Sequence, residues 1–192
     1  MTEFLSFSPP EIDKREILRY AAGGNGAEIS ALLDACIDKA RSVLNYNVAF
    51  CELEFTIRGN KCDFGKFCVS SASLAKNLSK ARRVFLFVAS VGHGIDRLIA
   101  KFSRTSPLSA LLFNAIGTER VEALADSFVA WLEKENCAKA LSRFSAGYGD
   151  LPLALQKDVF EILKPERQMG VFLSDRFVMS PSKSVTAFVG LE

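Results

Sequence analysis

Histidine is almost absent from this 192-residue chain, which contains only His93. A single histidine excludes metal sites built from several histidines, and any Ser-His or Cys-His hydrolase would depend on that one residue. No nucleophile motif accompanies His93, which stands between two glycines in "SVGHGID". We therefore interpret His93 as a turn residue, and we expect no metal site.

Paired cysteine motifs are also missing. The five cysteines are odd in number and include no C-x-x-C pair, which argues against a disulfide framework and against a zinc ribbon. We expect buried or partly buried free thiols at all five positions, which are Cys36, Cys51, Cys62, Cys68 and Cys137.

No apolar run is long enough to cross a membrane. The longest, "VFLFVASV" at 84–91, is far shorter than the ~20 residues that a membrane helix needs, and it is typical of a buried strand. The N-terminus "MTEFLSFSPP" has an early acid and no basic start, so it does not resemble a secretory signal. We expect a cytoplasmic protein without a membrane partner.

The common phosphate-binding motifs are absent as well. Neither G-x-G-x-x-G nor G-x-x-x-x-G-K-[ST] occurs, which argues against the usual dinucleotide and nucleoside-triphosphate sites. The net charge is only +2, and the basic residues are spread out except for Lys80, Arg82 and Arg83. A solvated helix end explains that cluster, so no nucleic-acid partner is expected.

What the chain does contain is enough apolar sequence for one sizeable core: 49% of the residues are hydrophobic, and 16 are Phe. There is neither a repeat nor a low-complexity linker. The patterns predict helices over 9–21, 27–44, 71–81, 93–103, 107–135 and 152–164, a strand over 83–91, a β-hairpin around "RGNK", and two strands around "SPSKS". The "GGNG" stretch at 23–26 is interpreted as a helix terminator. Because strands and helices do not alternate regularly, we predict a single α+β domain with a mainly antiparallel twisted sheet and packed helices.

One stripe of the predicted 107–135 helix carries a carboxylate among small and apolar side chains. Its members are Leu111, Ala115, Thr118, Glu122, Ala125 and Val129. A carboxylate at Glu122 needs either solvent or a cation, because an unpaired buried charge costs several kcal/mol. The helical wheel leaves both possibilities open.

The loop "RFSAGYGD" precedes the 152–164 helix and exceeds what packing requires. Gly147 and Gly149 permit backbone conformations that are closed to other residues, and they permit close approach to a ligand. Arg143 offers a fork-shaped cation nearby. We expect Asp150 to accept hydrogen bonds from the first N–H groups of the helix that follows it.

Three segments together resemble a known domain: "AIGTERVEALAD", "RFSAGYGDLPLALQKDVFEIL" and "GVFLSDRFVMSPSKSVTAFVG". The specific elements are R-x-x-x-G-Y, starting at Arg143, and the hairpin pattern F-x-M-x-P-x-x-S-V, starting at Phe177. Over about residues 115–191 the chain resembles the reactivation domain of cobalamin-dependent methionine synthase, and more closely the stand-alone proteins that carry this domain. Residues 1–110 then supply the N-terminal helices and strands of the same domain, and 111–192 supply the half that resembles an S-adenosylmethionine-binding unit.

The resemblance implies binding of S-adenosylmethionine and action on cobalamin carried by a partner, a methionine synthase or another corrinoid protein. A flavodoxin-type donor supplies an electron to the cob(II) state, and S-adenosylmethionine supplies the methyl group. By the same resemblance, Arg143 takes the ligand carboxylate and Glu122 faces its ammonium. Gly147 and the catalytic candidate Tyr148 form the wall nearest the methyl group, and Ser184 of the hairpin motif contributes to cofactor binding. The family's early acid has no counterpart that we can assign in residues 1–110.

Three functions follow in order of preference. The first is a stand-alone reactivation subunit for a cobalamin-dependent methionine synthase, in methionine biosynthesis. The second is a non-catalytic module that docks on a corrinoid protein and no longer binds S-adenosylmethionine. The third is a hydrolase that uses His93. For the first two we expect the 107–135 helix and the 169–190 hairpin to flank one concave surface, with exposed apolar area around Tyr148 for docking.

Overall fold

The computed structural model of the chain describes residues 1–21 and 27–192, so the interpretation of "GGNG" lies outside the described residues. The helices are α1 (Lys14–Tyr20), α2 (Ala27–Arg41), α3 (Ala72–Asn77), α4 (Gly94–Phe102), α5 (Pro107–Asn136), the 3₁₀ turn η1 (Leu153–Leu155), α6 (Gln156–Leu163) and α7 (Pro165–Met169). The strands are β1 (Glu3–Ser6), β2 (Asn47–Leu53), β3 (Thr56–Arg58), β4 (Lys61–Asp63), β5 (Cys68–Ser70), β6 (Arg83–Ser90), β7 (Phe172–Leu173), β8 (Met179–Ser180) and β9 (Ser184–Leu191).

The main sheet has the strand order β1-β2-β6-β9, and every neighbouring pair in it is antiparallel. A small sheet β3-β4-β5 and the two-stranded β7-β8 complete the strands. The predicted hairpin around "RGNK" is the β3–β4 pair, in which Arg58 lies opposite Lys61. The mainly antiparallel α+β architecture predicted from the sequence is confirmed.

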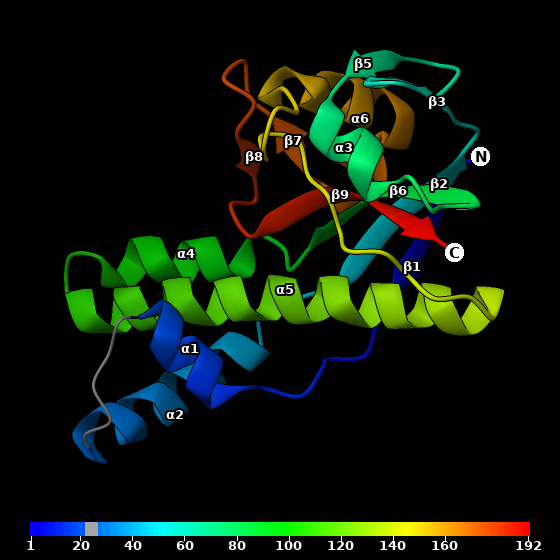
Figure 1. The fold of residues 1–192 in the computed structure, drawn as a ribbon. Coiled ribbons are helices and arrows are strands. Elements are labelled where there is room, and N and C mark those ends of the chain that lie inside the picture. Colours follow the sequence, from blue (N-terminus) through cyan, green and yellow to red (C-terminus); the bar gives the residue numbers. More distant parts are fainter. Residues whose placement is uncertain (22–26) are drawn as a thin grey trace.

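Both faces of the main sheet are covered, which explains why β6 is apolar at nearly every position. Phe85, Phe87 and Ala89 belong to one core cluster, whereas Val84 and Leu86 belong to a second. Figure 1 shows α5 on one side of the sheet and α3 and α6 on the other. Successive side chains of β6 point to opposite faces of the sheet, so they are buried alternately in two cores, and neither face is left to solvent.

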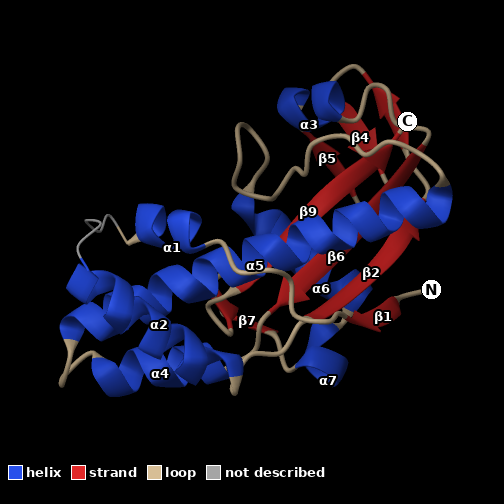
Figure 2. Ribbon diagram, turned by 90° about the horizontal axis from the view of Figure 1, so that it is seen from below, coloured by secondary structure: helices blue, strands red, loops and turns tan. Residues whose placement is uncertain are grey.

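The 30-residue helix α5 is the longest element and confirms the predicted 107–135 helix. It runs obliquely across β2, β6 and β9 (Figure 2), and its Phe128 ring packs against the rings of Phe50 and Phe87. On its other flanks α5 contacts α1, α2 and α4. In the part of the chain that the structure describes, no helix combines the length and the apolar character needed to cross a membrane.

The predicted 9–21 helix begins later than expected, at Lys14. Asp13 is its N-cap, and the Asp13 carboxylate accepts hydrogen bonds from the backbone N–H groups of Arg15 and Glu16. Residues before Asp13 cannot continue a helix that starts with this cap, because the cap residue itself has an extended backbone with φ −96° and ψ 96°. Residues 7–13 therefore form an irregular segment, whose anchoring becomes important below.

The prediction of a C-terminal hairpin is wrong in its pairing. Strands do lie on both sides of "SPSKS", but β8 pairs with β7, and β9 pairs with β6 along its whole length. Pairing with β6 places Ala187 and Val189 in one core and Phe188 in the other, which a short local hairpin could not do.

The cysteine prediction holds for three of the five positions. Cys36, Cys51 and Cys62 are buried free thiols, whereas Cys68 and Cys137 are exposed and free.

Candidate functional site

The structure brings Glu122 and Arg143 into direct contact, although 21 residues separate them in sequence. One guanidinium nitrogen of Arg143, Nη2, donates to Glu122 Oε2 at 2.9 Å and to Asp126 Oδ1 at 2.9 Å. Glu122 and Asp126 are one helical turn apart on α5, so their carboxylates point to the same side. The side chain of Arg143 is 24% exposed, compared with 41% for Glu122 and 72% for Asp126. The pair therefore lies at the mouth of a depression and remains within reach of a ligand.

The backbone around Arg143 is held against the last strand of the sheet. The N–H of Leu141 donates to the carbonyl of Gly190 at 2.8 Å, and Phe144 and Phe188 exchange both of their backbone hydrogen bonds. Arg143 lies between these two anchor points. Its side chain is thus carried by a fixed stretch of backbone that faces α5.

A pocket of about 490 Å³ contains both members of the pair. This acidic pocket is lined by Glu11, Asp13, Glu16, Tyr20, Glu119, Glu122, Ala123, Asp126 and Arg143. Its volume lies within the range usual for small-molecule sites, roughly 300–1,000 Å³. A larger pocket of about 620 Å³ shares Glu11 with it but contains neither Glu122 nor Arg143, so we assign the candidate site to the acidic pocket.

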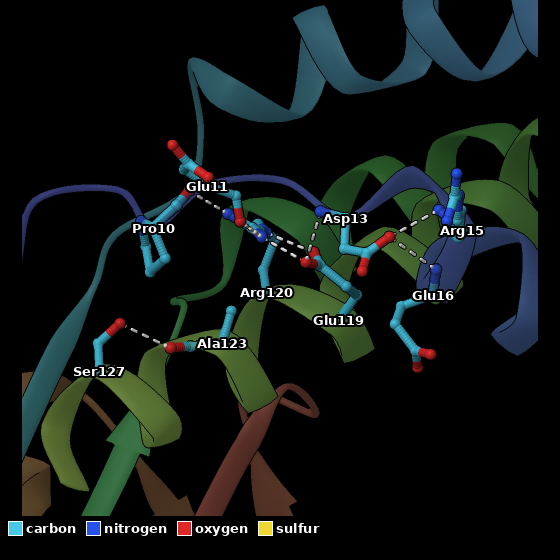
Figure 3. Close-up of polar contacts among 9 residues, drawn as sticks. All are labelled: Pro10, Glu11, Asp13, Arg15, Glu16, Glu119, Arg120, Ala123 and Ser127. Atoms are coloured by element: carbon cyan, nitrogen blue, oxygen red, sulfur yellow. Dashed lines mark hydrogen bonds and ion pairs between the residues drawn. The ribbon is translucent and has the colours of Figure 1, made fainter. Parts of the chain in front are cut away.

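The second wall of the acidic pocket comes from the N-terminal segment and α1. Figure 3 shows the side chains of Glu119 and Arg120 on α5 reaching the backbone of Pro10, Glu11 and Asp13 in this segment. Sequence patterns alone do not connect residues 11–16 with Glu122, since more than 100 residues separate them. Acids from residues 11–16 and from α5 thus line the pocket together with the cation Arg143, while the Glu16 carboxylate is also paired with Arg19 and the Asp13 carboxylate caps α1.

Gly147 and Tyr148 lie at the exposed end of the loop and are not part of the acidic pocket's lining. Gly147 has φ +91°, which favours glycine, and a Cβ atom there would meet Leu153 Cδ1 at 3.3 Å. The Tyr148 side chain is 65% exposed, and Leu153 beside the loop is 45% exposed. Some apolar surface is therefore exposed near Tyr148.

Asp150 caps a helix, but not the predicted one. Its carboxylate accepts hydrogen bonds from the Ser71 hydroxyl at 2.5 Å and from the backbone N–H groups of Ala72 and Ser73, at the start of α3. The Ser71 hydroxyl, followed by these N–H groups, holds the pKa of the Asp150 carboxyl far below its usual range. The start of α3 lies next to the loop that carries Asp150, and Asp150 caps α3, whereas η1 begins without any side-chain cap.

Replacing Asp150 by Asn is expected to lower the melting temperature at pH 7, because the neutral amide makes weaker hydrogen bonds to the α3 N-terminus. A depressed folded-state pKa contributes stability above the unfolded value, which is about 3.9, and this stability is lost as the pH falls below it. The difference between wild type and D150N should therefore shrink below about pH 4. Thermal melts from pH 7 to pH 3 test this, and a pH-independent difference would contradict it.

Ser184 lies at the start of β9, where its hydroxyl is hydrogen-bonded to Ser90 Oγ and to the carbonyl of Pro181. It does not line the acidic pocket, so its role in cofactor binding stays a prediction. The residue before it, Lys183, was missed by sequence reasoning. Lys183 Nζ donates to Asn114 Oδ1 at 2.8 Å and to Thr118 Oγ1 at 2.9 Å, and burial lowers the pKa of this lysine.

These contacts define a polar stripe on α5 with a cation at each end. Asn114, Thr118, Glu122 and Asp126 follow one another at four-residue intervals, with Lys183 over the first two and Arg143 over the last two. In the C-terminal segment 169–190, β9 packs against α5 and Lys183 reaches its polar stripe, but none of these residues lines the acidic pocket. The prediction that α5 and the 169–190 segment flank one concave surface is therefore wrong in its second wall, because the pocket beside α5 is lined by residues of the N-terminal segment and α1 instead.

Of the comparisons with known proteins, only the one with solved structures finds a match, and it identifies the fold and not a family. No protein-family model matches the chain, and no curated protein matches it in sequence. Among solved structures, it is similar to the MetH reactivation domain bound to AdoHcy, with a TM-score of 0.72 and 15% sequence identity. The match covers 99% of this chain and 78% of that chain. The chain therefore has the fold of that reactivation domain.

Proposed function

We propose that this chain is a stand-alone reactivation subunit for a cobalamin-dependent methionine synthase and that the acidic pocket binds S-adenosylmethionine. The observation that carries the proposal is the contact between Glu122 and Arg143 inside a pocket of suitable size. The structurally similar MetH domain was crystallised with AdoHcy, S-adenosylhomocysteine, which is the demethylated form of the same ligand.

The residues of the pocket fit the charges of this ligand. Its amino-acid end carries a carboxylate and an ammonium, and its sulfonium carries a second positive charge. Arg143 supplies a planar donor group for the carboxylate, whereas Glu122 and the acids of the N-terminal wall suit the two positive charges. Glu11, Asp13 and Glu16 line this pocket, which supports an acidic contribution from residues 1–110, although the carboxylates of Asp13 and Glu16 also cap α1 and pair with Arg19.

We assign docking of the partner to the exposed end of the loop that follows Arg143. Tyr148 and Leu153 are exposed and project beyond the Arg143 backbone, which β9 holds in place. In the proposed reaction the partner's cobalamin would receive one electron from a flavodoxin-type donor and the methyl group of S-adenosylmethionine, whose S–CH3 bond would break to release S-adenosylhomocysteine. This chain would hold the methyl donor at Arg143 and Glu122 and contact the partner through Tyr148. The proposed ligand-binding roles of Gly147 and Ser184 rest on the sequence resemblance alone.

Isothermal titration calorimetry with both ligand forms tests the proposal. S-adenosylmethionine is expected to bind about two- to fivefold more tightly than S-adenosylhomocysteine, because the sulfonium adds an attraction to carboxylates worth up to about 1 kcal/mol per exposed pair. Raising the salt concentration should narrow this difference.

The titration is repeated with a cobalamin-loaded methionine synthase that lacks its own reactivation domain. We expect complex formation and tighter ligand binding in its presence. Binding to the cobalamin protein without any binding of either ligand would favour the second function, a docking module that has lost the methyl donor. Tighter binding of S-adenosylhomocysteine would contradict the assigned charge pattern.

A further inference from the structure

The buried ion pair Glu119–Arg120 lies behind the N-terminal wall of the acidic pocket. The two side chains are 6% and 1% exposed, and they contact each other through two hydrogen bonds (Figure 3). Arg120 is thus among the largest fully buried side chains of the protein. Such a pair is weak evidence for stability, because desolvation of both charges offsets much of their attraction. Its remaining hydrogen bonds indicate another role.

Three further hydrogen bonds of the pair run to one short segment, and Tyr46 also lies close to the Arg120 guanidinium. Arg120 Nη1 donates to the carbonyl of Pro10 at 2.6 Å, and Arg120 Nη2 donates to the carbonyl of Glu11. Glu119 Oε1 accepts the backbone N–H of Asp13 at 3.1 Å. Residues 10, 11 and 13 belong to the irregular stretch between β1 and α1, where no strand or helix fixes the backbone. The hydrogen bonds from Glu119 and Arg120 therefore hold the backbone of this segment in place.

The same turn of α5 carries the candidate ligand residue. Glu122 follows Glu119 by three positions, so both side chains lie on one side of the helix, and both line the acidic pocket. A shift of the N-terminal segment away from the pair would move Glu11, Asp13 and Glu16 away from Glu122 and Arg143. The backbone on the Arg143 side of the pocket cannot shift in the same way, because its hydrogen bonds to β9 hold it in place.

We infer that Glu119 and Arg120 are positioning residues, which lock residues 10–13 against α5 and thereby set the width of the acidic pocket and its affinity for the ligand. The inference rests on the proposed function for the identity of the ligand, but the locking of the segment is independent of that identity.

The test uses the double variant Glu119→Leu/Arg120→Met, which replaces the pair by apolar side chains. Such replacements often leave stability unchanged or raise it. We expect a melting temperature near that of wild type, at least tenfold weaker binding of S-adenosylmethionine by calorimetry, and faster amide hydrogen exchange over residues 11–17. The last readout needs no ligand.

The matched control is Glu52→Leu/Arg83→Met, which removes a 2.6 Å ion pair between β2 and β6, outside the acidic pocket. Its ligand affinity should equal that of wild type. If the first double variant does not fold, Arg120→Lys replaces it: lysine keeps the charge but cannot span the carbonyls of Pro10 and Glu11 together. Its affinity should also fall at least tenfold.

The outcomes separate the two proposals. A wild type that binds S-adenosylmethionine and a double variant that binds it equally well would overturn the positioning role and leave the proposed function standing. If wild type binds neither ligand form, the proposed function fails, and hydrogen exchange then decides the inference. Unchanged exchange over residues 11–17 would overturn it, whereas faster exchange would support the lock.

Discussion

Substituting Arg143 by Lys is expected to weaken the binding of S-adenosylmethionine by about 10- to 150-fold, which corresponds to the ~1.5–3 kcal/mol of a hydrogen bond to a charged group. Lysine keeps the positive charge but loses the planar fork that binds a carboxylate through two parallel hydrogen bonds. Calorimetric titration of wild type and R143K measures the change.

The present contacts of Arg143 allow this fork to form. Its Nη2 donates to Glu122 and to Asp126, so a ligand carboxylate that uses Nη2 must displace one of these acids. Asp126 is the easier one to displace, because its side chain is 72% exposed and exposed ion pairs contribute at most about 1 kcal/mol. Glu122 would then remain beside Arg143, available to the ligand ammonium.

Thermal stability should barely change in R143K, because lysine can still pair with either exposed carboxylate. Arg82→Lys, a substitution of the same kind at the exposed residue before β6, serves as the control for binding. Equal affinity of R143K and wild type would remove Arg143 from the ligand site. A large fall in the melting temperature, with binding proportional to the folded fraction, would make Arg143 a structural residue that ties the loop to α5.

The elements that the sequence predicted well are those whose signal is local. The α5 helix has a long apolar periodicity, and β6 is an apolar run of strand length bounded by polar residues, so both were placed to within a few residues. Both elements form because their own side chains are buried. The partner of each element is a different matter, because it depends on segments far away in the chain.

Pairing and capping illustrate this limit. "SPSKS" predicted a turn between two strands, yet β9 pairs with β6, whose centre lies about 100 residues earlier. Asp150 has the side chain of a helix cap, yet it caps α3, about 78 residues earlier, in preference to the turn that follows it. In both cases the local pattern predicts the kind of interaction, strand pairing or helix capping, and the tertiary fold determines which segment is the partner.

The candidate site divides in the same way. Glu122 and Arg143 were proposed from the helical wheel and the resemblance, and the structure places them in contact. The roles proposed for Gly147, Tyr148 and Ser184 stay predictions. The Glu119–Arg120 pair gave no sequence signal, because adjacent opposite charges on a helix usually point to different sides and stay solvated. Its role in holding the N-terminal segment is visible only in the structure, where Arg120 donates to the carbonyl groups of Pro10 and Glu11, roughly 110 residues earlier.

Removing one member of that pair is expected to cause a large loss of stability. Arg120→Met should lower the free energy of unfolding by about 3–5 kcal/mol, because Glu119 would remain buried with an uncompensated charge. The carbonyls of Pro10 and Glu11 would lose a donor but can turn to water, since Glu11 is exposed. Urea unfolding at pH 7, with the midpoint and the slope fitted separately, measures the change.

The origin of this loss can be tested by a double-mutant cycle with Glu119→Leu. If the unpaired charge is the cause, Glu119→Leu/Arg120→Met should be closer in stability to wild type than R120M is, because the second substitution removes the stranded carboxylate. Additive losses would instead mean that the hydrogen bonds to residues 10–13 dominate. A double variant that is no more stable than R120M would argue against the stranded charge, and the pair's contribution would then lie in the hydrogen bonds that hold residues 10–13 against α5.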